Sequence, residues 1–171
     1  MKTMTLTEPI FVNLFSLLSQ TQLLTDGVPN GTPAFLTTSR TLPQVSNVSA
    51  AIQPALYIIE GEQDVMENVQ AAAKYELHCA AVVFFRNELG PEPATPASTQ
   101  LNNLRDAVIY QLQQATLAAD GTTVITLFGG QRQTLGGLVY HARVKGRILA
   151  NEGLQNNQAA LVFPISILSG M

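Results

Sequence analysis

Two adjacent side chains carry the strongest possibility of chemistry in this sequence. His78 and Cys79 follow one another in the run KYELHCAAVVFFR. Such a pair could supply a nucleophile with its base, or two ligands for a metal ion. The run alternates polar and apolar residues as a strand does, and successive strand residues point to opposite faces. We therefore expect Cys79 in the core and His78 on the polar face, so that they do not share a site.

A metal site built from His78 and His141 lacks a third ligand. Both histidines fall on polar faces of expected strands that could be neighbours, but protein zinc sites use three or four protein ligands. Because Cys79 is the only cysteine, four-sulfur zinc sites and intrachain disulfides are excluded. The sequence predicts no catalytic residue, no metal site and no cofactor.

Glycine pairs and clustered carboxylates give no stronger signal. Gly129-Gly130 and Gly136-Gly137 do not fit the phosphate-binding pattern G-x-x-x-x-G-K-[ST], and turns or bulges explain them better. The acidic residues between positions 60 and 67 could form an acid–base pair, but nothing apolar surrounds them to shift a pKa. For residues 61–73 we favour a solvated acidic loop over a short helix. That loop carries Glu62, Asp64 and Glu67.

Positive charge recurs at alternate residues of the strand expected at residues 138–149. Its core face should hold Leu138, Tyr140, Ala142, Val144, Gly146 and Ile148, and its polar face Val139, His141, Arg143, Lys145, Arg147 and Leu149. Three explanations of the charges stay open, which we rank as docking onto an acidic partner, pairing with Glu76 across strands, and contact with nucleic-acid phosphates. Nucleic acid comes last because no aromatic residues lie between the charges to stack on bases.

Two helices are expected to position these residues. The first runs over residues 7–23, since Thr7 can cap it and Glu8 and Pro9 suit its first turn. Its buried stripe is Phe11, Leu14, Phe15 and Leu18. The second begins near Ser98, with the stripe Leu101, Leu104, Val108, Leu112 and Ala115.

Strands are expected at residues 33–38, 54–60, 74–86, 123–128, 138–149 and 159–167. The last two form a long antiparallel unit within residues 133–168, in which Pro164 argues for an edge or a bulge because it cannot donate to a ladder. The strands neighbour one another as hairpins and do not alternate with helices. The sequence therefore predicts a single α+β domain over residues 1–171, with a mainly antiparallel sheet and two helices packed on one face.

Composition favours a weakly charged, soluble protein of the cytosol. Charged residues make up 12% of the chain, about half of the usual fraction, which is typical of a surface that other subunits partly cover. The net charge of −3 is too small to attract nucleic acid in bulk. The N-terminal run lacks a signal-peptide cleavage site, and no segment reaches the roughly 18 apolar residues of a membrane span. From the residues alone we expect an oligomeric protein that is not an enzyme.

Several segments in order carry a resemblance. An opening amphipathic helix, EPIFVNLFSLLS, is followed by FLTTSRTLPQVSNV and QPALYIIEGEQ. The strand KYELHCAAVVFF precedes the helix TQLNNLRDAVIYQL, and the chain closes with QTLGGLVYHARVKGRI and QAALVFPISIL. Over residues 8–169 this order resembles the tail-terminator, or tail-completion, proteins of long-tailed bacteriophages, of the minor tail protein U type.

The resemblance implies a structural virion protein made in the host cytoplasm. Its subunits would form a ring, commonly a hexamer, at the head-proximal end of the tail tube, where the ring stops tube polymerisation and joins the tail to the neck. The implied partners are further copies of the chain, the tail-tube protein and a head-completion or neck protein. DNA would pass through the ring without sequence-specific binding, and the family has no catalytic residue to carry over.

A closed ring needs a heterologous interface, in which one patch of a subunit meets a different patch of the next. The basic residues Arg143, Lys145 and Arg147 and the acidic residues Glu62, Asp64 and Glu67 are complementary in sign, so we expect them to meet between copies. Two other functions stay open. One is a head-completion or neck connector protein, and the other is a small ligand-binding domain or enzyme whose site the sequence hides.

Overall fold

The structure is a computed structural model that describes residues 7–44, 47–66, 74–86, 97–114, 133–151 and 158–170. In chain order the elements are α1 (Thr7–Ser19), β1 (Gln22–Thr25), β2 (Val28–Pro33), β3 (Thr37–Ser39), the short 3-10 helix η2 (Ala50–Ile52), β4 (Ala55–Met66), β5 (Lys74–Arg86), α2 (Ala97–Gln113), β6 (His141–Val144), β7 (Leu149–Asn151) and β8 (Gln158–Gly170). Glu67, Ala115 and the strand expected at residues 123–128 lie outside the described residues.

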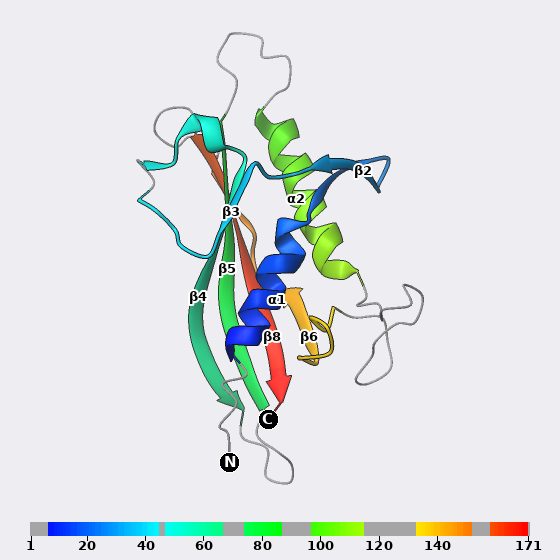
Figure 1. Cartoon of the computed structure of the whole chain (residues 1–171), viewed down its shortest axis with the longest axis vertical. Helices are drawn as coiled ribbons and strands as arrows, with labels where there is room; N and C mark the ends of the chain where they lie inside the picture. The colour runs from blue at the N-terminus through cyan, green and yellow to red at the C-terminus, as the bar shows by residue number, and fades with distance from the viewer. Residues whose placement is uncertain are drawn as a thin grey trace.

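Three long antiparallel strands form the centre of the larger sheet (Figure 1). β5 lies between β4 and β8, and it pairs with β8 from Lys74 opposite Gly170 to Arg86 opposite Gln158. β3 pairs in parallel with the start of β4, and β6 and β7 pair with the other side of β8. β1 and β2 form a separate hairpin. The α+β class with a mainly antiparallel sheet is therefore confirmed.

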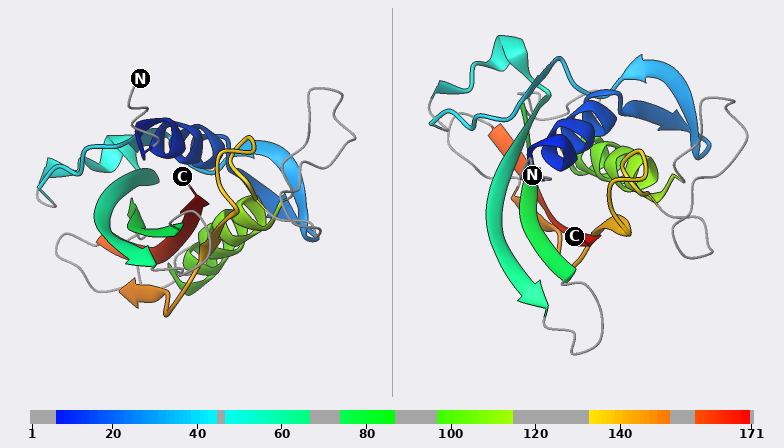
Figure 2. Two further views of the ribbon diagram at one scale, coloured as in Figure 1. Left: turned by 90° about the horizontal axis from the view of Figure 1, so that it is seen from below. Right: turned by 60° about the horizontal axis from the view of Figure 1, so that its bottom comes forward.

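Both helices pack on one face of this sheet, as expected (Figure 2). On β8 that face carries an apolar row in which no side chain is more than 1% exposed, namely Ala159, Leu161, Phe163, Ile165 and Ile167. Alternate residues of β5 and the apolar stripes of α1 and α2 complete the same core. Each large apolar side chain gains about 1.5–3 kcal/mol by leaving water, so this layer is the main source of stability.

The opposite face of the sheet is apolar at one end and polar at the other. Ala55 and Tyr57 of β4 turn to this face and pack with Val48 in a second, smaller core, whereas Leu56 and Ile58 turn toward the helices. Both faces at the start of β4 are therefore buried. The polar end of this face, which we call the polar face, holds the charged residues that the sequence indicated.

The first helix is shorter than expected. α1 ends at Ser19, and Leu23 belongs to β1. Asp26 and Gly27 form the turn of the β1–β2 hairpin with φ of 52° and 78°. A two-residue turn with positive φ matches the twist of paired strands, so this local signal ends the helix early.

The long hairpin expected within residues 133–168 is shorter at its start. Residues 133–140 form turns, in which Leu135, Gly136 and Gly137 have positive φ, and β6 begins only at His141. Val139, expected on the polar face, is therefore in the main core and 1% exposed, while Leu138 is 38% exposed. The expected alternation of faces was wrong before β6 because those residues are not extended.

Pro164 is accommodated by a break in the strand beside it. Its carbonyl accepts a hydrogen bond from the Lys145 N–H (2.9 Å), so its ring nitrogen faces the same side, where β6 has ended and β7 has not begun. Gly146 in this break has φ of 114°, and a side chain there would lie 3.4 Å from the Pro164 ring. The expected irregularity is present, but β8 is not an edge strand.

Residues 61–66, expected as an acidic loop, continue β4 beside β5. A register shift between Glu60 and Gln63 marks a bulge, where a side chain on Gly61 would meet the carbonyl oxygen of His78 at 2.7 Å. Residues 61–64 are all exposed, so this part of the strand shows no apolar alternation. Because the apolar alternation is missing, the sequence of these residues resembles that of a loop.

Shortening a core side chain of α2 tests the layer order. Leu104 is 4% exposed and belongs to the same core as Val83, Val144 and Phe163. We expect Leu104→Ala to lower the free energy of unfolding by about 2–5 kcal/mol, measured by urea denaturation. The neighbouring exposed residue Asn103 provides the control, Asn103→Ala. Equal losses in the two variants would mean that this side of α2 faces solvent.

Candidate functional site

A partly buried carboxylate organises the polar face. The side chain of Glu76 on β5 is 14% exposed, and its Oε1 lies 2.5 Å from Nζ of Lys145. The same oxygen accepts a hydrogen bond of 2.5 Å from Oγ of Ser166 on β8. We call these three residues the Glu76 cluster. Charge-assisted hydrogen bonds of this kind are among the stronger polar contacts in proteins.

Strand register brings the cluster together. His78 lies opposite Ser166, and Ser166 lies opposite Arg143, so these three residues form one row across β5, β8 and β6. Glu76 stands in the next row, two residues along β5 and hence on the same face. Lys145 follows directly after β6 and reaches back to Glu76. Three strands therefore supply the cluster, although no single sequence segment contains it.

Electrostatics in the cluster favour the charged carboxylate. The hydrogen bond from Lys145, and then that from Ser166, lower the pKa of Glu76 from 4.5 to about 2. Burial opposes this effect, but it is the smaller contribution. Glu76 is thus an anion whose charge is satisfied inside the subunit. The second-ranked explanation of the basic residues, cross-strand pairing with Glu76, is correct for Lys145.

One grouping on this face has the residue types of a hydrolase triad, namely Asp64, His78 and Ser166. The sequence alone did not suggest this grouping. Asp64 Oδ2 lies 2.9 Å from Nε2 of His78, but Ser166 is 1% exposed and its hydroxyl hydrogen points to Glu76. Burial also raises the pKa of the Cys79 thiol to about 12. Neither side chain is a ready nucleophile, because neither is deprotonated or open to a substrate.

The expected acidic and basic patches are only partly available for a partner. Arg143 and Arg147 are exposed and make no ion pair with another described residue. On β4, Asp64 pairs with His78, and Glu62 is exposed. The contacts of Lys145 and Asp64 lie within the subunit but leave their side chains 49% and 69% exposed, so for these two residues the expected contact with a neighbouring copy is neither confirmed nor contradicted. It stays a prediction for Arg143, Arg147 and Glu62, and Glu67 lies outside the described residues.

Arg40 makes a second charged contact, which no sequence pattern indicated. Its guanidinium donates to both carboxylate oxygens of Glu8 on α1 (2.6 and 2.9 Å) and also to Glu60 on β4. The hydrogen bond from Arg40 lowers the pKa of Glu8. These contacts tie the start of α1 to β4. They also give Glu60 an ion-pair partner, whereas Glu62 on the same strand is exposed.

No protein-family model matches the chain, and no curated protein does either. Within the part of the chain that the structure describes, no three His, Cys, Asp or Glu side chains are grouped to hold a metal ion. None of the described helices is long and apolar enough to cross a membrane. What distinguishes this surface is that Glu76 and Lys145 are paired with each other, whereas Arg143 and Arg147 are exposed.

Neutralising Glu76 tests the cluster. Because its folded-state pKa is depressed, the charged form stabilises the fold fully above pH 4.5, and this stabilisation is lost as the pH falls toward 2. We expect Glu76→Gln to lower the free energy of unfolding at neutral pH by about 1–2 kcal/mol. Urea denaturation across that pH range should show the difference from the unmodified chain shrinking. Glu62→Gln is the matched control, and an equal effect there would contradict the assignment.

The burial of Cys79 predicts that its thiol reacts slowly with thiol reagents. Cys79 is 7% exposed, and its raised pKa leaves almost no thiolate at neutral pH. We expect a thiol reagent to label the folded protein at least a hundredfold more slowly than the protein in denaturant. Equal rates in the two conditions would place the thiol on the surface.

Proposed function

We propose that this chain is a structural ring subunit of the tail-terminator kind. In this proposal it closes the head-proximal end of a phage tail tube and joins the tail to the neck. Its partners are further copies of itself, the tail-tube protein and a head-completion or neck protein. DNA passes through the ring without sequence-specific contacts, and the protein acts in the virion without catalysis.

The observation that carries the proposal is the difference between Lys145 and its arginine neighbours. Lys145 is neutralised by Glu76 within the subunit, whereas Arg143 and Arg147 remain exposed without an ion pair to another described residue. Because neither arginine makes such a pair, their charges add little to the stability of an isolated subunit. A second protein surface that supplies hydrogen-bond acceptors makes them useful.

The layered fold supports the same conclusion. Both helices lie on one side of the sheet, and Arg143 lies on the other side, in the row of His78 and Ser166. A subunit with chemically different surfaces on opposite sides can contact its neighbours head to tail. Head-to-tail contacts that repeat around an axis close into a ring.

Charge reversal tests the assembly role. We expect Arg143→Glu with Arg147→Glu to change the unfolding free energy by less than about 0.5 kcal/mol, because exposed charges rarely matter more. The double variant should form rings poorly at micromolar concentration and leave tail tubes uncapped and overlong. The defect should depend on salt, since exposed charge pairs are screened over roughly 8–10 Å.

The measurements are sizing, a melting curve and electron microscopy of tubes mixed with the protein. Arg86→Glu is the matched control, because Arg86 is exposed at the far end of β5. If the double variant still closes rings and caps tubes at normal length, the assembly role is wrong. If it unfolds, the arginines pair within their own subunit. Rings that bind heads but leave tube length unchanged would instead favour a head-completion protein.

A further inference from the structure

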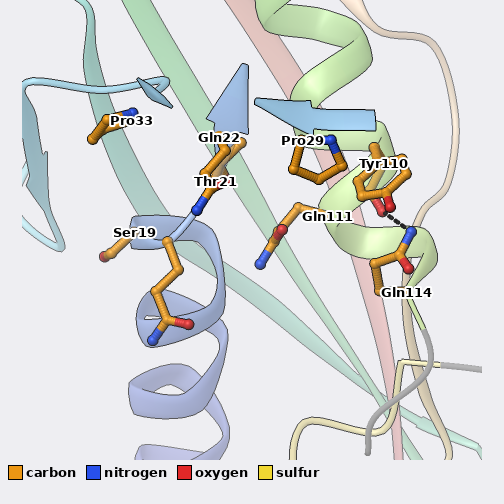
Figure 3. A pocket seen from close by; sticks show the side chains of 9 residues that line it. Ser19, Thr21, Gln22, Pro29, Pro33, Tyr110, Gln111 and Gln114 are labelled. Carbon is orange, nitrogen blue, oxygen red and sulfur yellow. Dashed lines mark hydrogen bonds between the residues drawn. The ribbon is translucent and has the colours of Figure 1, made fainter. Parts of the chain in front are cut away.

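A pocket of about 530 Å³ lies where the two helices end beneath the β1–β2 hairpin (Figure 3). The last residues of α1, the hairpin and the last turn of α2 surround it. The lining residues that matter for its chemistry are Ser19, Thr21, Pro29, Tyr110, Gln111 and Gln114. None of the lining side chains among the described residues is charged.

From helix polarity we expect the potential in this pocket to be negative. The C-terminus of an α-helix carries roughly half an elementary negative charge, concentrated on its last carbonyl groups. Neither α1 nor α2 has a basic residue in its last turn, so neither helix compensates this charge within its own described residues. Two such ends beside one pocket favour a positively charged occupant.

The hydrogen-bonding groups of the pocket also favour a donor. The amide nitrogen of Gln111 donates to the Leu17 carbonyl (3.0 Å), and that of Gln114 donates to the Tyr110 carbonyl (3.1 Å). Their side-chain oxygens are thereby left as acceptors. The hydroxyl of Ser19 likewise donates to a carbonyl of α1 at 2.7 Å, which leaves its lone pairs for a ligand, whereas Thr21 donates to Leu18 and is 1% exposed. The pocket thus offers acceptor groups of Ser19, Gln111 and Gln114, whereas the side-chain oxygen of Gln22 already accepts from the Gly31 N–H (3.1 Å).

We propose that this pocket receives the side chain of Arg143 from a second copy of the chain. A guanidinium presents five N–H donors, is weakly hydrated and stacks on aromatic rings. Tyr110 and Pro29 lie side by side in the pocket (Figure 3) and provide an aromatic face and an apolar wall. Lysine fits less well, since its compact ammonium is strongly hydrated and cannot bridge several acceptors in one plane.

The donor must come from another copy. In its own subunit Arg143 lies on the polar face beside Ser166, whereas the helices that frame the pocket pack on the opposite face. The sheet separates the two, so the contact joins different surfaces of two copies, as a ring requires. The acidic edge of β4 is the alternative counterpart: Glu60 is paired with Arg40 there, whereas Glu62 is exposed and the partner of Asp64 is a histidine, which is charged only if protonated. This inference rests on the proposed self-assembly.

Opposite charges placed at Gln114 give the sharpest test. Gln114 is exposed, so Gln114→Lys and Gln114→Glu should both fold. We expect the lysine variant to weaken subunit association at least tenfold and the glutamate variant to strengthen it severalfold, measured by sedimentation velocity over a concentration series. Monomer stability should move the other way, because a cation suits a helix C-terminus and an anion does not. That opposition separates a contact between copies from a change in folding.

A charge swap identifies the donor. Arg143→Glu should weaken association as much as Gln114→Lys, and the two substitutions together should restore it. Arg86→Glu combined with Gln114→Lys is the matched control and should not restore it. Rescue of Arg143→Glu by Glu62→Lys instead would show that the edge of β4 is the counterpart and overturn the proposal.

Two further results would distinguish this inference from the function on which it rests. Rings that form with unchanged affinity in both the Gln114→Lys and the Arg143→Glu variants would overturn the pocket contact and leave the ring proposal standing. An unmodified chain that stays monomeric at micromolar concentration and caps no tubes would overturn the ring proposal itself, and the pocket contact with it.

Discussion

The apolar row of β8 is the feature on which the other layers depend. It lies under both helices and belongs to a strand that pairs with β5 on one side and with β6 and β7 on the other. Because side chains alternate between faces, a slip of one residue against β5 would bring this row to the polar face and bury Ser166 and Pro164 under the helices. The free-energy cost of exposing the apolar row and burying those two residues fixes the register of the sheet.

Register in turn places the charges. Once β8 is fixed, His78, Ser166 and Arg143 must lie in one row, and Glu76 comes within reach of Lys145 and Ser166. The polar face is therefore a consequence of apolar burial on the other side of the same strands. Its carboxylate is neutralised locally, which leaves the arginine beside it as the unmatched group of that surface.

The sequence predicted the parts of the fold in which one physical signal dominates. Period-two alternation placed β5 and the β8 row correctly, and helical spacing placed the α2 stripe from Leu101 to Leu112. It failed where local backbone preference overrides periodicity, as at the expected end of the first helix, where the strand β1 leads into the hairpin turn at Asp26-Gly27. It also failed on β4 beyond Glu60, because an exposed strand has no apolar face to reveal it.

The candidate site was harder to predict because it depends on neighbours that are distant in sequence. The positive charges were visible as a row, but which of them a carboxylate neutralises depends on the pairing of β5, β8 and β6. Pairing with Glu76 was one of the alternatives for the basic residues as a group. In the part of the chain that the structure describes, Lys145 is the basic residue that makes this pair. The contacts of Arg40 and the pocket between the helix ends leave no periodic signal in the sequence, because they are formed by loops and by the ends of helices and strands.

The two-sided burial at the start of β4 has a consequence for how the molecule opens. Between Ala55 and Ile58 no side chain is more than 3% exposed, so these backbone amides become accessible only when both cores separate. The β1–β2 hairpin has no buried residue, and a two-stranded hairpin is marginally stable alone. Amide hydrogens should therefore exchange with solvent first in the hairpin, through local fraying, and last in β4 and the adjoining part of β5, through global unfolding. The hairpin that borders the pocket can thus rearrange without loosening the sheet.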